Sequence, residues 1–401
     1  MKGITLAFLL SVLIVRALGQ NYDESKVPGY TLPNALKTAD NTVVTDKTTW
    51  ENIRRPEIVT LFESTIYGQM PKGYDSIKFT VKNENPLAMG GRARLKEVLI
   101  EVFKINRSVK INLVLFVPNK LKCPAPAFLL INNRGKENTD PTRVIKSNFW
   151  PAEMVIDSGY AIAAFQVNDA APDSVPTFKN GVLQLYPEQL AKDNGMRAIG
   201  AWAWAASRVM DYFEKDRAID AKKVAVVGHS RGGKAALWAA AQDQRFAIPF
   251  SNCSGNTGAA LARRRFGETI SKINTTFPHW FNDDYKKYND KEDSLPVDQH
   301  MLIAVMAPRP AYVTSASEDV WADPKGSFLA LKNAENVYAL YGLRSQLPAD
   351  PPPVNTPVIY SPIGYHNREG GHNLTAYDWG NFIRFANYHH LKDISLNCGG
   401  N

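Results

Sequence analysis

The chain has 401 residues, 44% of them hydrophobic and 21% charged, which is typical of a globular protein with a sizeable core in one domain or two. The formal net charge is +8, but the basic residues are scattered apart from three arginines at 263–265, which argues against a nucleic-acid-binding surface. Three cysteines allow at most one internal disulfide and show no metal-ligand spacing, so we expect neither a disulfide scaffold nor a metal site.

The first residues are typical of a secretory signal peptide. A short basic start, Met1 and Lys2, precedes a nearly unbroken apolar run at 4–15, and small residues at 17–19 stand at the cleavage spacing. The apolar run is shorter than a comfortable membrane span. We therefore expect residues 1–19 to be removed. The remaining 20–401 should form one secreted or periplasmic domain with an N-terminal arm and no membrane partner.

The rest of the chain predicts strands that alternate with helices. Two apolar-rich strands, 98–105 and 109–117, flank a short polar turn and predict a hairpin. The alternation that follows predicts an α/β fold, with a mostly parallel sheet covered on both faces and the hairpin as antiparallel strands at one edge. Further strands are predicted at 127–131, 160–166, 224–227, 247–251, 311–316 and 358–362, and helices at 54–69, 196–213, 325–338 and 377–391.

The most informative motif lies at 224–234, where the sequence VAVVGHSRGGK predicts a buried strand, a sharp turn and a helix. Residues 228–232 fit G-x-S-x-G, the nucleophile elbow of α/β-hydrolases, which places a serine above the sheet. The glycines allow the tight turn, and the N-terminus of the new helix brings N–H dipoles near a developing oxyanion. The motif predicts Ser230 as a nucleophile, within an α/β-hydrolase three-layer sandwich.

A serine nucleophile needs a histidine base, which follows it in the chain order of this fold. His366 and His372 both lie after the last predicted strand, where the base belongs. His372 is the better candidate, because the two glycines before it let the loop come close and the final helix follows it.

The acid that orients the histidine should also follow a strand. Glu318, Asp319 and Asp323 come directly after the predicted strand 311–316, and each is a candidate on the residues alone. The loop after strand 247–251 contains Cys253 and no carboxylate.

The string GHSRGGK at 228–234 resembles the serine motif of glucuronoyl esterases, carbohydrate esterase family fifteen. The likeness covers residues 50–392 and is greatest to bacterial-type members, which lack the disulfide set of the fungal ones. It continues through the strings at 251–255, 258–261, 263–264, 267–269, 277–281, 295–300, 307–310, 321–324 and 364–366.

This resemblance implies roles for residues around the serine. Ser230 would be the nucleophile and His372 the base. Arg231 would stabilise the oxyanion through its backbone N–H and its guanidinium, and a fixed cation suits that task because it reorganises little as charge develops. Lys234, one helical turn after Ser230, would hydrogen-bond sugar hydroxyls.

Two further residues and the acid also follow from the resemblance. Glu268 and Trp321 would bind the uronate ring, with the tryptophan as an apolar wall. Many family members carry the acid at the position of Cys253, where this chain has a thiol. Some bacterial-type members place it after the next core strand, which here matches Asp319, with Glu318 as the alternative.

The activity implied is that of a secreted carbohydrate esterase of the 4-O-methyl-glucuronoyl methylesterase type. It would hydrolyse esters between glucuronate side chains of xylan and lignin alcohols through an acyl-enzyme, as a monomer and without metal, organic cofactor or nucleic acid. One alternative is an acetyl-xylan or feruloyl-type esterase on the same site. Another is a catalytically inactive carbohydrate-binding homologue, which the missing carboxylate at Cys253 leaves open.

Overall fold

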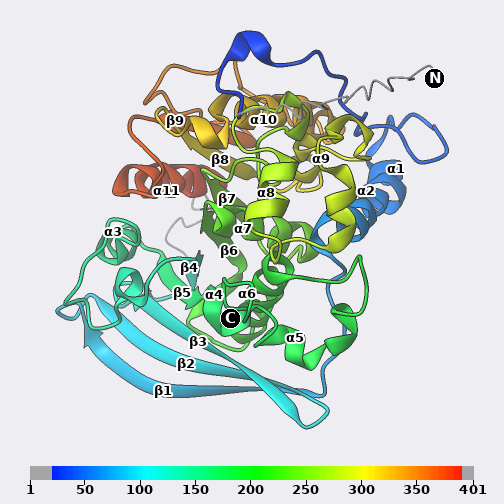
Figure 1. Cartoon of the computed structure of the whole chain (residues 1–401). Coiled ribbons are helices and arrows are strands. Elements are labelled where there is room, and N and C mark those ends of the chain that lie inside the picture. The colour runs from blue at the N-terminus through cyan, green and yellow to red at the C-terminus, as the bar shows by residue number, and fades with distance from the viewer. Residues whose placement is uncertain (1–19, 391–401) are drawn as a thin grey trace, which may run out of the picture.

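The computed structural model describes residues 20–390, so the predicted signal peptide at 1–19 lies outside the described residues. A nine-stranded sheet runs through the molecule in the order β1-β2-β3-β5-β4-β6-β7-β8-β9 (Figure 1). The strands are β1 (Ser76–Ala88), β2 (Ala93–Lys104), β3 (Arg107–Pro118), β4 (Ala125–Asn132), β5 (Ala161–Gln166), β6 (Ile219–His229), β7 (Ile248–Asn252), β8 (Ala311–Ala316) and β9 (Ile363–Arg368).

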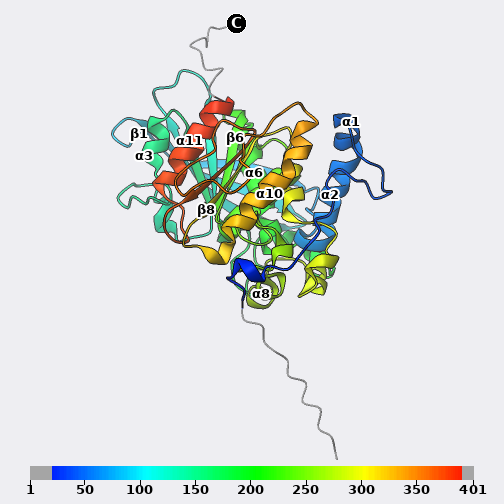
Figure 2. The same cartoon turned by 90° about the horizontal axis from the view of Figure 1, so that it is seen from above.

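Helices cover both faces of the sheet. Residues of α3 (Ala152–Asp157) and α11 (Ala376–His390) form one apolar cluster against it, and residues of α2, α6, α7, α9 and α10 form a larger cluster. Figure 2 shows α11 and α10 on opposite sides of the strands. The remaining bounds are α1 (Lys47–Thr49), α2 (Arg55–Phe62), α4 (Val167–Ala170), α5 (Val182–Leu185), α6 (Ala198–Phe213), α7 (Arg231–Gln242), α8 (Ile270–Thr276), α9 (Gln299–Ala304) and α10 (Pro324–Ala339).

The direction of the strands places the loops that matter on one edge. From β5 to β9 the neighbouring strands are parallel, so their carboxyl ends share that edge. The register aligns His229, Asn252, Thr314 and His366 across β6 to β9. A row of buried polar side chains therefore lies where these four strands end.

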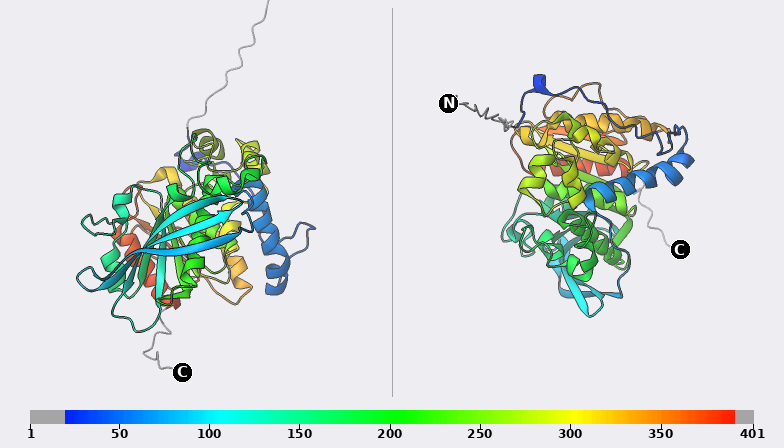
Figure 3. Two further views of the ribbon diagram at one scale, coloured as in Figure 1. Left: turned by 90° about the horizontal axis from the view of Figure 1, so that it is seen from below. Right: turned by 45° about the vertical axis from the view of Figure 1, so that its right-hand side comes forward.

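The antiparallel edge confirms the predicted hairpin and adds a strand. β2 and β3 pair antiparallel, with Lys104 opposite Arg107 at the turn. β1 pairs with β2 and was not predicted from the sequence. Most of its side chains are exposed, so it lacks the apolar signal of a buried strand. Figure 3 shows these long strands (blue to cyan) at the edge of the molecule.

The predicted strand at 358–362 is wrong. The last strand is β9, Ile363–Arg368, and Val358 makes only an isolated bridge with Tyr365. His366 therefore lies within a strand, whereas His372 lies in the loop that follows it.

The segment from residue 20 to the first helix is attached along its length to the domain. The backbone N–H of Gly267 donates to the carbonyl of Asn21 at 2.8 Å, and His300 Nε2 donates to the carbonyl of Pro33 at 2.9 Å. Cys123 is disulfide-bonded, while Cys398 lies outside the described residues. Between residues 20 and 390, no helix has the length and apolar character needed to cross a membrane.

Candidate active site

Ser230 occupies a sharp turn between β6 and α7. Its backbone has φ 57° and ψ −126°, a conformation that side-chain-bearing residues rarely adopt. The turn is held by a hydrogen bond from Ser230 N to Asn252 O (2.8 Å) and another from Gly233 N to Ser230 O (2.9 Å). A Cβ at Gly228 would lie 1.9 Å from the carbonyl oxygen of Gly232, so the close approach of strand and helix requires glycine there. This is the geometry of a nucleophile elbow.

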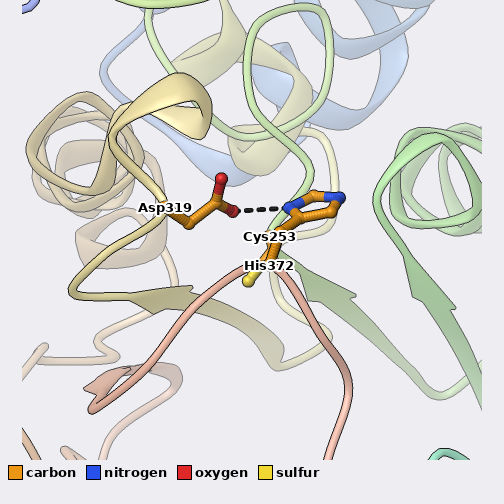
Figure 4. Close-up of side chains that lie close together, drawn as sticks. All are labelled: Cys253, Asp319 and His372. Carbon is orange, nitrogen blue, oxygen red and sulfur yellow. Dashed lines mark hydrogen bonds and ion pairs between the residues drawn. The ribbon is translucent and has the colours of Figure 1, made fainter.

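Asp319 and His372 meet beside this turn. His372 Nδ1 lies 2.6 Å from Asp319 Oδ2, and the two side chains point toward one another (Figure 4). Asp319 is buried, while the side chain of His372 is 38% exposed. A buried carboxylate bonded to Nδ1 leaves Nε2 free to exchange protons with a serine.

The other acid candidates have different environments. Glu318 is exposed, and Asp323 caps α10 by accepting a hydrogen bond from Gly326 N at 2.8 Å. Asp323 also pairs with Arg264 Nε at 2.8 Å. Of the three carboxylates left open by the sequence, the structure brings only Asp319 to a histidine.

Cys253 lies next to this pair. The sulfur of Cys253, a carboxylate oxygen of Asp319 and a ring nitrogen of His372 all lie within 4.8 Å of one another (Figure 4). Burial, and then the charges of Asp319 and Asp378, raise the pKa of the thiol well above its ordinary value. The thiol is therefore neutral at physiological pH and supplies no charge to the histidine.

An arginine holds the loop that carries His372. Arg368, at the end of β9, donates through Nη2 to the carbonyls of Gly371 (2.7 Å) and Asn373 (2.8 Å), on either side of the histidine. Asp378 accepts from Arg368 Nε at 3.1 Å and is fully buried. Sequence analysis missed this pair, because nothing in the chain distinguishes it from other charged residues.

His366 belongs to a buried network below the site. Its Nε2 lies 2.9 Å from Asp378 Oδ1, and its Nδ1 lies 3.0 Å from the hydroxyl of Tyr312. Asn252 Nδ2 donates to the same carboxylate at 3.2 Å, and Asn252 Oδ1 lies 2.5 Å from His229 Nδ1. With both ring nitrogens in use and no exposed surface, His366 is not placed to act as the base.

Arg231 begins α7 directly after the serine. Its Nε lies 2.5 Å from Asp173 Oδ2, and its guanidinium carbon lies 5.7 Å from the ring centre of Trp280. Its side chain is 32% exposed. Asp173 was not among the sequence candidates, since it lies far from the serine motif along the chain.

Lys234 and Glu268 form a buried pair. Lys234 Nζ donates to Glu268 Oε2 at 2.8 Å and to the carbonyls of Ser254 (2.7 Å) and Asn256 (2.5 Å). Burial raises the pKa of Glu268, and the charge and hydrogen bond of Lys234 oppose that rise. All three ammonium donors are occupied within the protein, so contact of Lys234 with a sugar hydroxyl stays a prediction.

Trp321 lies against the segment that carries Glu268. The backbone N–H of Glu268 donates to the carbonyl of Trp321 at 2.9 Å. Gly267, at φ 60°, makes this approach possible, because a Cβ there would lie 2.4 Å from the same carbonyl oxygen. The backbone thereby fixes the tryptophan relative to the buried pair.

These side chains share one cavity of about 270 Å³. All seven residues assigned from the sequence line it, together with Cys253 and two aromatic residues that received no role. The lining comprises Ser230, Arg231, Lys234, Cys253, Ser254, Gly255, Glu268, Phe277, Trp280, Asp319, Trp321, Ala322 and His372. A serine at a nucleophile elbow, a histidine paired with a carboxylate, a cation and apolar walls in one cavity are the groups that nucleophilic attack on a carbonyl needs.

Comparisons with known proteins agree with this geometry. A sequence model described as "Glucuronyl esterase, fungi" matches residues 100–342. A curated relative, "Carbohydrate esterase MZ0003" from an unknown prokaryotic organism, is 43% identical over 403 residues, covering 92% of each chain. The chain belongs to the glucuronoyl esterase family.

Solved structures of glucuronoyl esterases share its whole architecture. One, described as a promiscuous CE15 esterase from a marine bacterial metagenome, has a TM-score of 0.85 at 42% identity and covers 92% of this chain and 100% of its own. Another, from Solibacter usitatus, has a TM-score of 0.84 at 37% identity and covers 91% of this chain and 100% of its own. The chain is accordingly a serine carboxylic-ester hydrolase of the α/β-hydrolase fold, which confirms the family and fold predicted from its motifs.

Parts of this glucuronoyl esterase site were not predicted from the sequence. Asp173 contacts Arg231, and Arg368 holds the loop of His372, but no local sequence pattern marks Asp173 or the Arg368–Asp378 pair. Trp280 did leave a signal, since it lies in the string at 277–281 that resembles the family. That string also contains Phe277, whose ring stacks on Trp280 with centres 3.7 Å apart.

Proposed function

We propose that the chain hydrolyses esters between glucuronate side chains of xylan and lignin alcohols, with Ser230, His372 and Asp319 as its triad. The observation that carries this proposal is the short contact of His372 Nδ1 with Asp319, in a cavity that also contains the serine elbow and the buried Lys234–Glu268 pair.

The geometry supports a two-step mechanism. Ser230 Oγ attacks the ester carbonyl carbon while His372 Nε2 takes its proton, and Asp319 stabilises the imidazolium that forms. The carbonyl oxygen becomes an oxyanion, which Arg231 and the N-terminus of α7 face. The alcohol leaves with the proton held by His372. Water then attacks the acyl-enzyme, with His372 again as base, and releases the uronic acid.

Side chains of the cavity would recognise the uronate ring, without a metal or a cofactor. A sugar ring offers hydroxyl groups at its edge and C–H groups on its faces. Glu268 supplies acceptor oxygens for the hydroxyls, and Trp321 supplies an apolar surface for a face. The glucuronate ester is uncharged at its reacting carboxyl group, so this wall needs no free cation.

The place of action is part of the same proposal. A polymer of plant cell walls is met outside the cell, and the predicted signal peptide at 1–19 would export the chain to it. We infer a secreted or periplasmic monomer.

The decisive experiment compares hydrolysis of benzyl glucuronate with that of 4-nitrophenyl acetate. Efficient turnover of the first and little of the second is expected. The reverse preference would favour an acetyl-xylan or feruloyl-type esterase. This alternative is tested because the metagenomic relative is described as promiscuous. Loss of both activities, with no labelling of Ser230 by a serine-directed phosphonate, would favour an inactive carbohydrate-binding homologue.

A further inference from the structure

Asp173 lies where three segments of the chain converge beside the cavity. It follows α4, and its Oδ1 accepts hydrogen bonds from His279 Nε2 (2.9 Å) and Trp280 Nε1 (2.7 Å), two residues that follow α8. Its Oδ2 lies 2.5 Å from Nε of Arg231, the first residue of α7. One carboxylate thus joins the residue next to the nucleophile to a wall of the cavity.

The carboxylate is itself held firmly. Two ring donors fix Oδ1, so Oδ2 has little freedom in direction, and the side chain is 18% exposed. Burial alone would raise the pKa of Asp173, but the hydrogen bond from His279 and the charge of Arg231 bring it below its usual range. Asp173 is therefore ionised at neutral pH and can pair with the charged Arg231.

The contact through Nε determines what the guanidinium can still do. An arginine has five N–H donors in a planar fork. The ion pair with Asp173 is made at Nε, so the two terminal nitrogens of Arg231, a residue that lines the cavity, remain for another partner. The ring of Trp280 limits movement of the same guanidinium, since its centre is 5.7 Å away.

A second cation, Arg134, lies near Arg231, and a carboxylate beside Arg231 reduces the repulsion between the two positive charges. Arg134, in the loop after β4, lies near enough that the charge of Arg231, after burial, lowers its pKa. Arg134 Nη2 lies 3.3 Å from His229 Nε2, beside the nucleophile. The charge of Asp173, in contact with Arg231, offsets the repulsion between the two arginines.

We propose that Asp173 is a positioning residue, which holds the Arg231 guanidinium at the cavity wall so that its terminal nitrogens meet the developing oxyanion. The inference rests on the proposed function in one respect, the role of Arg231. It adds that this role depends on a carboxylate from a distant loop, supported by Trp280 and His279. Catalysis would thereby gain a cation that is already oriented when the intermediate forms.

The test is a double-mutant cycle of Asp173→Asn and Arg231→Ala, measured on the full chain. Asp173→Asn should lower kcat by about 10–100-fold with little change in KM, because misplacement of a catalytic group has effects of this size. In the Arg231→Ala background the same substitution should change kcat less than about twofold, because the group it positions is gone. Trp280→Phe, which removes one donor to Asp173, should give a smaller loss that also disappears in that background.

A matched control lies four residues away. Asp169→Asn removes a carboxylate that accepts from Asn112 N at 2.8 Å and, within the part of the chain that the structure describes, bonds to no residue lining the cavity, so kcat should stay near wild type. Equal losses from Asp173→Asn in both backgrounds would show a general structural role and overturn the inference, as would wild-type kcat for Asp173→Asn. The cycle is run with whichever of the two esters, benzyl glucuronate or 4-nitrophenyl acetate, the wild type hydrolyses faster, so failure of the glucuronate substrate is distinguishable from failure of this inference.

Discussion

Ser230 shows how much of the chemistry depends on the backbone of one residue. Its conformation costs a side-chain-bearing residue of order 1–3 kcal/mol, and the fold around it supplies that free energy. Because the strain comes from the backbone and not from the hydroxyl group, removing the hydroxyl should leave the fold intact.

We therefore expect Ser230→Ala to lose ester hydrolysis by several orders of magnitude, since a nucleophile has no substitute in the site. Unfolding curves in denaturant should overlay those of the wild type. Residual activity above roughly one-hundredth of wild type would point to another nucleophile.

The second prediction at this scale concerns the acid. Asp319→Asn should reduce kcat by about 10⁴, the size expected when a triad histidine loses the carboxylate that sets its tautomer. Glu318→Gln, one residue away and exposed, is the matched control and should have little effect. Cys253→Ala should be nearly neutral, because the thiol contributes no charge. A loss from Glu318→Gln equal to that from Asp319→Asn would contradict the assignment.

The loop between β9 and α11, which carries His372, is held in place by a buried charged pair. Arg368 is bonded to carbonyls on both sides of His372, and its partner Asp378 is fully buried. The position of His372 is thus set by a charged pair beneath the loop.

Arg368→Met should destabilise the protein by about 3–5 kcal/mol, because Asp378 stays buried with its charge uncompensated. It should also lower kcat, since the histidine loop loses its anchor. Arg309→Met is the control: Arg309 also donates to buried carbonyls, those of Ala240 and Phe246, but at the far end of α7 from the serine. It should reduce stability and leave kcat, measured below the unfolding temperature, near wild type.

The same elements show what could be predicted from the sequence. The strands at 127–131 and 311–316 were predictable because buried parallel strands are continuous apolar runs. Glu318, Asp319 and Asp323 were candidates because they follow such a strand, and the family resemblance favoured Asp319 among them. β9 was missed because its buried side chains include His366 and Arg368, whose burial depends on Asp378 in the next element. Asp173 could not be found, since its partners are joined to it only by the tertiary fold.

For the molecule as a whole, buried neutral histidines determine how stability changes with pH. Burial lowers the pKa of His229 well below its usual value, with the nearby His372 adding to the effect, and burial also lowers that of His300. The unfolded chain then binds more protons than the folded one once the pH falls below about 6.5, the ordinary histidine value. Stability is fully present above that pH and is lost as the pH falls.

We expect the unfolding temperature to fall between pH 7 and pH 5, before the carboxylates titrate. His300→Gln should make this dependence shallower, because glutamine can still donate to the carbonyl of Pro33 but binds no proton. Thermal melts at half-unit intervals of pH would measure the slopes. Identical slopes for the variant and the wild type would exclude His300 as a contributor.

The attachment of Asn21 to Gly267 has a practical consequence for enzyme immobilisation. Gly267 precedes Glu268, which lines the cavity, so a support coupled at residue 20 would stand beside the cavity and obstruct a bulky substrate. The turn between β2 and β3 offers a better anchor, because Ile105 is 73% exposed and these strands lie toward the opposite edge of the sheet from β7 to β9 (Figure 3). Coupling there would leave the cavity unobstructed for a bulky substrate.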